Sequence, residues 1–264
     1  MTVITGKRGR RATNLRRMTV ALIVPIALVV VWWAVSARST SPFFPPLGSI
    51  LASLGDQWLA TRVTSDVLPS LGRMFSGFAI ASVAGIGLGA LLGRLPLAAR
   101  ALNPVLQFGR ALPATALVPV SIVLMGIGNS PKIALIAFVT FFPVLLNTID
   151  GVRNVDPVME DVCRSYRLTR VQRFLQVQLP AAAPQILAGM RIALSVAFVM
   201  MVVTELVAAT DGIWYVTLLA QQSFQVSLMW SGMLLLGILG VLINGVFVLV
   251  ERKLLRWYTQ TLED

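Results

Sequence analysis

Hydrophobic positions in this 264-residue chain fall into long uninterrupted runs, and polar positions are concentrated in the segments between them. The first run, 18–37, contains no charged residue. Because a helix of about 20 apolar residues crosses a hydrocarbon layer of about 30 Å, runs of this length predict membrane-spanning helices. We expect six spans, at residues 18–37, 71–93, 111–128, 132–150, 186–208 and 231–250.

These runs predict one all-α integral membrane domain over 18–257, with no internal repeat and no soluble domain. A basic tail, 1–17, precedes the domain, and a short tail, 258–264, follows it. The fourth and fifth expected spans are separated by a polar loop at 151–185, which is patterned like packed helix rather than like a flexible linker.

Small residues recur at four-residue intervals in the second expected span, at Gly77, Ala81, Gly85, Gly89 and Gly93. This spacing either lets another helix approach closely or reflects the general frequency of glycine in membrane helices. Ahead of this span, the amphipathic pattern of 50–58 predicts a helix on the membrane surface.

Composition supports a membrane protein, since 56% of residues are hydrophobic, only 12% are charged and mean hydropathy is +0.81. The formal net charge of +11 would suggest nucleic-acid binding in a soluble protein. With six spans, sixteen Lys and Arg residues lie on one side of the membrane and three on the other, apart from three at span ends. The positive-inside rule explains this sorting, so we expect no nucleic-acid partner and place both termini and the loop 151–185 in the cytoplasm.

Several kinds of chemistry are excluded by residue content. The chain has no histidine, which removes imidazole acid–base catalysis and imidazole metal sites. Its single cysteine, Cys163, excludes an internal disulfide. No G-x-x-x-x-G-K-[ST] motif occurs, so we expect no ATP site of the P-loop type. We therefore expect no catalytic, cofactor or metal site and no enzyme activity in this chain.

The loop 151–185 contains a predicted amphipathic helix. Asp156-Pro157 is a favourable helix start, because aspartate caps free N–H groups and proline suits the first helical turn. Val158, Val162 and Tyr166 then follow at four-residue intervals and form an apolar ridge. Four arginines flank the ridge, at positions 164, 167, 170 and 173.

This loop resembles the EAA loop of ABC-importer permeases, which reads E-A-A, three residues, G, nine residues, I, any residue, L-P. Asp161, Val162 and Cys163 stand at the E-A-A places, Arg167 at the glycine place, and Val177, Leu179 and Pro180 at the end. The likeness extends over about 45–257. Glu205 and the segment 220–224 are similar to the nitrate, sulfonate and taurine branch.

The resemblance implies a type I permease subunit that translocates a small anionic solute in the inner membrane of a prokaryote. Its implied partners are a second permease copy, two cytoplasmic ATP-binding subunits carrying ATP and Mg, an extracytoplasmic solute-binding protein and the lipid bilayer. The residues implied to dock the ATPase are Val158, Glu160, Asp161, Val162, Cys163, Arg164, Tyr166, Arg167, Thr169, Arg170, Leu179 and Pro180. Alternatively, the loop lies on anionic headgroups. Arg167, which replaces the glycine of the motif's turn, either is simply helical or tunes which ATPase is accepted.

Three polar residues near or within spans are candidates for the solute pathway or its gate. Glu205, inside the fifth expected span, is either part of a gate or a hydrogen-bonding anchor between helices. Gln107 and Arg110, before the third expected span, either attract an anion or anchor the helix at the membrane surface.

A self-sufficient membrane protein is the rival interpretation. An ion-coupled secondary transporter normally has several ionisable residues within its spans and broken-helix repeats. A membrane enzyme requires a catalytic constellation. The sequence shows neither pattern, and uptake by the chain without an ATPase would separate the two classes.

Overall fold

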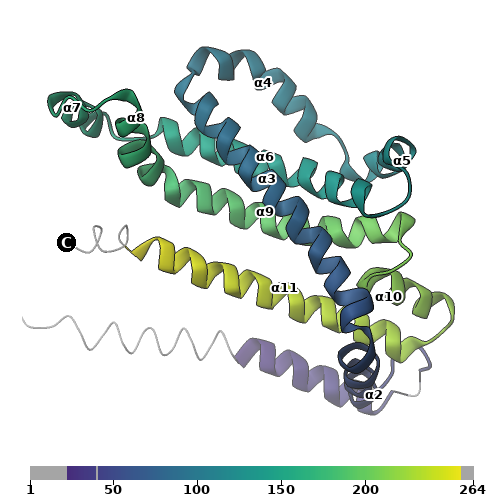
Figure 1. Ribbon diagram of the computed structural model, residues 1–264. Helices are drawn as coiled ribbons and strands as arrows, with labels where there is room; N and C mark the ends of the chain where they lie inside the picture. The colour runs from purple at the N-terminus through teal and green to yellow at the C-terminus, as the bar shows by residue number, and fades with distance from the viewer. Residues whose placement is uncertain (1–22, 40, 257–264) are drawn as a thin grey trace, which may run out of the picture.

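The computed structural model describes residues 23–39 and 41–256, and every regular element in those residues is a helix (Figure 1). The expected all-α class is therefore confirmed for the described chain. The elements in order are a helix at Ile23–Ala37, α2 (Leu47–Ser53), η1 (Leu54–Val67), α3 (Leu68–Arg94), α4 (Pro96–Ala111), α5 (Ala114–Met125), α6 (Asn129–Arg153), α7 (Pro157–Ser165), α8 (Arg170–Arg173), η2 (Phe174–Gln178), α9 (Leu179–Ala208), α10 (Ile213–Gln222) and α11 (Val226–Leu254).

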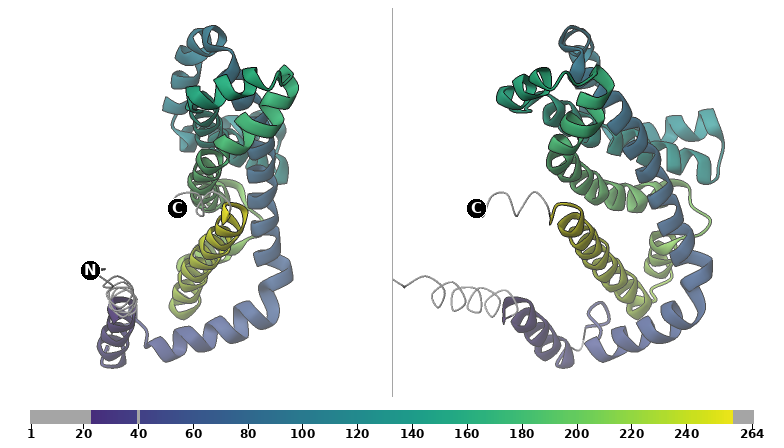
Figure 2. Two further views of the ribbon diagram at one scale, coloured as in Figure 1. Left: turned by 90° about the vertical axis from the view of Figure 1, so that its left-hand side faces the viewer. Right: turned by 60° about the vertical axis from the view of Figure 1, so that its left-hand side comes forward.

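Three of these elements join into one long helical segment, Leu47–Arg94, whose middle part, η1, has the wider π-helical winding. Figure 2 shows the chain running across one end of the molecule before it turns into α3. The predicted surface helix around 50–58 is helical, but two residues of its apolar pattern are covered by the protein, while Leu51 is exposed. Ile50 and Trp58 are fully buried, and the Trp58 indole N–H donates to Ser231 Oγ of α11 at 3.0 Å.

The centre of the domain is formed by α3, α6 and α9, which lie side by side (Figures 1 and 2). A Cβ built at Gly85 or Gly89 would lie only 2.9 Å or 2.6 Å from the Cβ of Val144 or Thr148 on α6. Gly77 and Gly93 approach α6 in the same way. The four-residue spacing therefore serves close helix packing, as one of the two interpretations predicted.

The third expected span, 111–128, is not one continuous helix. Its first residue ends α4, the chain breaks at Leu112-Pro113, and α5 continues at an angle of 91° to α4. Proline removes a backbone donor and restricts the residue before it, which accounts for a break at this point. Between the second and third expected spans the chain is largely helical, because α3 ends at Arg94 and α4 begins at Pro96.

Four helical segments are long and apolar enough to cross a membrane, and α4 with α5 would make a fifth if the bent pair is one span. Helix Ile23–Ala37 is shorter, and 18–22 of the first expected span lie outside the described residues, as do the expected tails 1–17 and 258–264. The fourth, fifth and sixth expected spans correspond to α6, α9 and α11. Each of these helices is longer than its predicted span, so the expected loop 151–185 narrows to 154–178.

Candidate translocation cavity and docking helix

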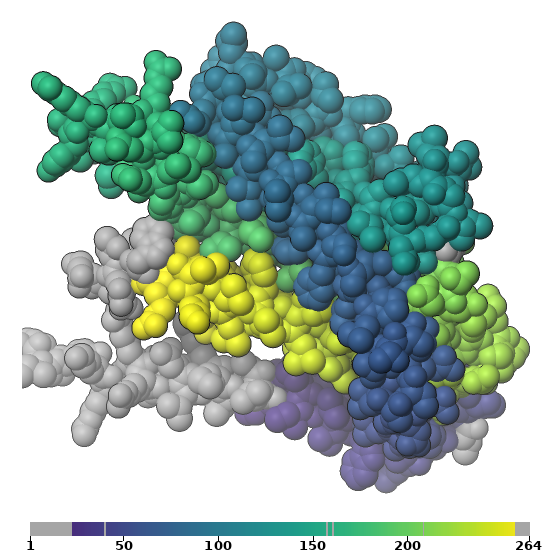
Figure 3. All heavy atoms as spheres, viewed as in Figure 1, coloured from purple at the N-terminus to yellow at the C-terminus, as the bar shows by residue number. Residues whose placement is uncertain are grey.

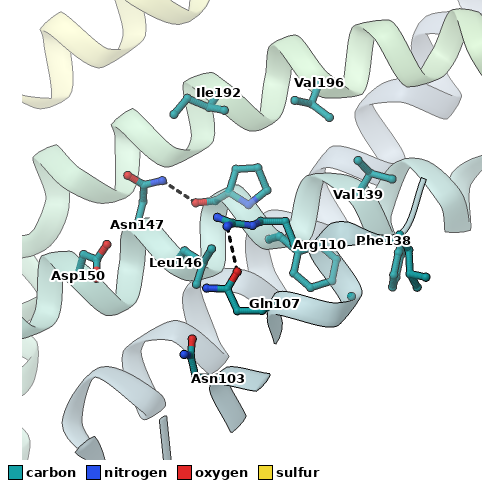
Figure 4. A pocket seen from close by; sticks show the side chains of 14 residues that line it. Asn103, Gln107, Arg110, Phe138, Val139, Leu146, Asn147, Asp150, Ile192 and Val196 are labelled. Atoms are coloured by element: carbon teal, nitrogen blue, oxygen red, sulfur yellow. Dashed lines mark hydrogen bonds between the residues drawn. The ribbon is translucent and has the colours of Figure 1, made fainter. Parts of the chain in front are cut away.

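A cavity of about 660 Å³ lies between α4, α6 and α9 (Figure 4). Helix α4 contributes the polar side chains of Asn103, Gln107 and Arg110, while α9 contributes the apolar side chains of Ile192 and Val196. A wall of α6, from Phe138 to Asp150, completes the cavity. Such a mixture of apolar lining and a few convergent polar groups is typical of a site for a small solute.

Arg110 and Gln107 face the cavity together, because they are three residues apart on α4. The Arg110 Nη2 group donates to Gln107 Oε1 at 2.9 Å, and both side chains are exposed. The structure places both residues on the cavity wall, and contact with an anion stays a prediction.

Asn147 is positioned on α6 by two hydrogen bonds. Its Nδ2 group donates to the Pro143 carbonyl at 2.8 Å, and its Oδ1 atom accepts from Gln185 Nε2 of α9 at 3.1 Å. The two helices approach closely here, since a Cβ on Gly189 would lie 2.5 Å from Asn147 Cβ. Pro143 also deprives the Val139 carbonyl of its usual helical donor, which leaves a further acceptor at the cavity wall.

The charges around the cavity are one guanidinium, Arg110, and one carboxylate, Asp150, with amides between them (Figure 4). Arg110 can attract an anion and donate hydrogen bonds to it. Asp150 lies near the end of α6 that leads to α7, so it would repel an anion at that end. The arrangement can bind and orient a small polar solute.

Glu205 does not line this cavity but lies in a buried polar network at the other end of α9. Its side chain is 1% exposed and accepts from Ser70 Oγ at 2.5 Å and from the Trp214 backbone N–H at 2.9 Å. Arg73 Nη1 lies 3.5 Å from the same carboxylate. Glu205 lies on α9 and these partners come from α3 and α10, so the geometry favours the interpretation of Glu205 as an anchor between helices.

The network continues into the turn between α9 and α10. Arg73 Nη2 pairs with Asp211 Oδ2 at 2.9 Å, and the Gly212 N–H donates to Asp66 Oδ1 at 3.1 Å. Gly212 has φ +125, and a Cβ there would lie 2.5 Å from the Glu205 carboxylate. A glycine is therefore required at this turn, because other residues rarely adopt this backbone conformation and a side chain would collide with Glu205.

The predicted amphipathic helix of the loop is α7. Asp156 caps it, because its Oδ1 atom accepts from the Val158 N–H at 2.8 Å, as the sequence predicted. The apolar ridge faces away from the bundle, with Val158, Val162 and Tyr166 being 67%, 44% and 78% exposed. This part of the chain projects from one end of the molecule (Figures 1 and 3).

Arg167 keeps a turn at the position where the family motif has glycine. Its φ is +52, in the left-handed region, and the Leu168 N–H donates to the Cys163 carbonyl at 3.0 Å across the end of α7. The alternative that Arg167 is simply helical is therefore wrong. A non-glycine residue in this region costs roughly 1–2 kcal/mol, which the surrounding turn must offset.

Of the other expected docking residues, Glu160 has a side chain outside those that the structure describes, and most of the rest fall into two groups. Asp161, Arg164, Thr169 and Arg170 are exposed, and Arg164 lies 3.5 Å from Asp161. Thr169 forms a capping box with Gln172 at the start of α8. Cys163, in contrast, is 3% exposed, and Leu179 packs beside Ala182 and Ile186 of its own helix. Cys163 and Leu179 therefore support the fold beneath the exposed surface, and Pro180 lies in the first turn of α9.

Residues 81–257, more than half of the chain, match the family described as "Binding-protein-dependent transport system inner membrane component". The chain belongs to this family. Its members are non-catalytic ABC permease subunits, and membership implies a binding protein and an ATPase as partners.

Individual relatives match most of the permease. The chain is 33% identical to SsuC of Escherichia coli (strain K12), a protein named for aliphatic sulfonates transport, over 89% of this chain and 90% of the relative. TauC of the same organism, a taurine transport system permease protein, is 29% identical over 92% of this chain and 91% of the relative. NrtB of Leptolyngbya laminosa, a nitrate import permease protein, is 31% identical over 69% of this chain and 65% of the relative.

The permease fold also resembles a solved structure. The MetNI methionine ABC transporter, in inward-facing conformations, matches with a TM-score of 0.64 at 18% identity, over 75% of this chain and 98% of that chain. At this identity the likeness concerns the fold alone.

Sequence reasoning missed three residues that the permease brings to its cavity, Asn103, Asn147 and Asp150. Asn147 was detectable as a polar residue inside an apolar run. Asn103 and Asp150 carried no such signal, because Asn103 lies outside the expected spans and Asp150 is the last residue of one, and polar residues are common at both kinds of position.

Proposed function

We propose that this permease is the membrane subunit of an ATP-driven importer for a small anionic solute of the sulfonate, nitrate or taurine type. The observation that carries the proposal is the placement of Arg110 and Gln107 on the wall of a cavity between α4, α6 and α9. Similarity to relatives named for sulfonate, taurine and nitrate transport supports an anionic solute.

The proposed orientation puts the α7 end of the bundle and both termini in the cytoplasm of a prokaryotic cell, with six spans in the inner membrane. The uneven distribution of Lys and Arg between the two sides supports this orientation. In the six-span arrangement, 18–37 is the first span and α4 with α5 supplies the third.

The proposed complex contains two copies of the permease, two ATP-binding subunits that carry ATP and Mg, and an extracytoplasmic binding protein. The exposed ridge of α7 would bind an ATPase subunit, so that closure of the ATPase pair favours an outward-open bundle. Such coupling requires the ATP-bound ATPase pair to bind one bundle conformation more tightly than the other.

An uptake assay on the complete importer tests the cavity assignment. We expect Arg110→Gln to raise the solute concentration needed for half-maximal uptake by about 10-fold or more, because a hydrogen bond to a charged group contributes about 1.5–3 kcal/mol. Arg100→Gln, on the same helix but outside the cavity lining, is the matched control and should behave as the parent protein.

Unchanged uptake by Arg110→Gln would remove Arg110 from the pathway. Accumulation of the solute by the permease alone in proteoliposomes, without an ATPase, would overturn the whole proposal in favour of a secondary transporter.

A further inference from the structure

A second cleft, of about 740 Å³, lies at the α7 end of the bundle. It is bounded by the last turn of α3, the last turn of α6 and helix α8. Four arginines line it, Arg94, Arg153, Arg170 and Arg173, and none of its lining residues is acidic. The cleft is separate from the solute cavity, since the two share no lining residue.

The arginines come from three segments that are distant in sequence, so tertiary packing alone brings them together. Arg94 ends α3, Arg153 ends α6, and Arg170 begins α8. The Arg94 guanidinium is held over the Phe174 ring, 4.7 Å from its centroid, by a cation–π contact. Among the described side chains, no carboxylate forms an ion pair with Arg94, Arg153 or Arg170.

A cluster of guanidinium groups attracts an anion, and two further features indicate which kind of anion fits the cleft. Leu91 and Leu95 line the cleft beside the guanidinium groups and are exposed, and the exposed Leu97 follows at the start of α4. The cleft also lies where α3 and α6, two long helices of the membrane domain, end, which is the level expected for lipid headgroups. A guanidinium cluster bordered by exposed leucines suits an anion that carries a phosphate and apolar chains together.

We propose that this cleft binds the phosphate-bearing headgroup of an anionic phospholipid, with the acyl chains along the exposed leucines. On the orientation proposed above, the lipid would belong to the cytoplasmic leaflet, where anionic lipids attract basic segments. Because α8 lies between the cleft and α7, a bound headgroup would also hold the base of the docking helix against α3 and α6.

The test measures lipid binding by the full-length permease, using native mass spectrometry with phosphatidylglycerol and phosphatidylcholine as probes. We expect a tightly held phosphatidylglycerol in preference to phosphatidylcholine. The double variant Arg94→Gln/Arg153→Gln avoids the residues assigned to ATPase docking. It should bind phosphatidylglycerol about 30-fold more weakly, at about 1 kcal/mol for each arginine near the surface.

Two further variants separate a specific site from general attraction. Arg252→Gln/Lys253→Gln removes the same charge from the end of α11, outside the cleft, and should leave the affinity unchanged. Arg94→Lys/Arg153→Lys keeps the charge and should retain most of the affinity. Equal weakening by the α11 double variant would overturn the proposal.

The source of the phosphate is decided by competition. Failure of inorganic phosphate to displace phosphatidylglycerol supports a lipid site, and displacement at similar concentration overturns it in favour of a soluble anion. If the cleft variant keeps its lipid preference but loses the ATPase subunits on purification, the cleft is a protein-docking surface and the lipid proposal fails. None of these measurements depends on solute uptake, so the inference can fail while the proposed transport function holds.

Discussion

Arg167 illustrates how a single residue can retain a turn that its side chain disfavours. The position has φ +52, where glycine is normally preferred, and the hydrogen bond from Leu168 to Cys163 keeps the turn closed. The large basic side chain is exposed on the same surface as Tyr166. The departure from the family motif therefore places a basic side chain on the proposed docking surface, and the turn is left-handed at this residue.

Replacing Arg167 with glycine should stabilise the turn. We expect Arg167→Gly to slow amide hydrogen exchange in α7, by an amount corresponding to about 1 kcal/mol, because the cost of a left-handed non-glycine residue is removed. Arg164→Gly, inside α7, should instead speed amide hydrogen exchange in this helix, since glycine destabilises a helix by about 1 kcal/mol. Faster exchange in Arg167→Gly would contradict this account of the turn.

At the scale of elements, the contact of α3 with α6 depends on glycines one or two helical turns apart on α3. Gly89 is the tightest position, because a Cβ there would lie 2.6 Å from Thr148 Cβ and 2.8 Å from the Leu145 carbonyl. The second of these atoms belongs to the backbone and cannot move aside. The two helices therefore have little freedom to accept a larger residue.

Gly89→Ala should destabilise the purified permease by about 1–3 kcal/mol, the usual cost of overpacking, seen as a lower midpoint of thermal unfolding in detergent. Gly87→Ala is the matched control on the same helix, where an added Cβ meets nothing within 4 Å. This control should be neutral or slightly stabilising, because alanine is the better helix former. Equal effects at the two positions would show that packing against α6 is not the cause.

At the scale of the whole molecule, the exposed ridge of α7 is an apolar surface at the end of a membrane bundle. Val162→Asp should weaken association with the ATPase subunits by about 30-fold, the effect of losing one central interface residue worth about 2 kcal/mol. Co-purification of the complete transporter measures this directly. Val171→Asp places the same charge on an exposed position of α8 outside the ridge and should leave the complex intact.

If both aspartate variants retain their ATPase subunits, α7 is not the docking element. If both lose them, the docking surface extends beyond the ridge, and α8 belongs to it.

Local patterns determined much of this protein without a structure. Apolar run length predicted the helical class and the helices α6, α9 and α11, since hydrophobicity over about 20 residues depends only on neighbours in sequence. The cap at Asp156 and the ridge of α7 were predicted for the same reason. The angle between α4 and α5 was not, because Pro113 marks a break in a helix but not the direction taken after it.

Only the tertiary structure decided which polar groups meet. Arg110, Asn147 and Asp150 surround one cavity, Arg73, Glu205 and Asp211 form one buried network, and Arg94, Arg153 and Arg170 line one cleft. In each case the residues come from segments distant in sequence, and close packing across small residues such as Gly89 and Gly189 brings α3, α6 and α9 together. The periodicity of one helix does not indicate which other helix packs against it. The clustering of these polar groups therefore follows from packing between helices and not from the pattern within any one helix.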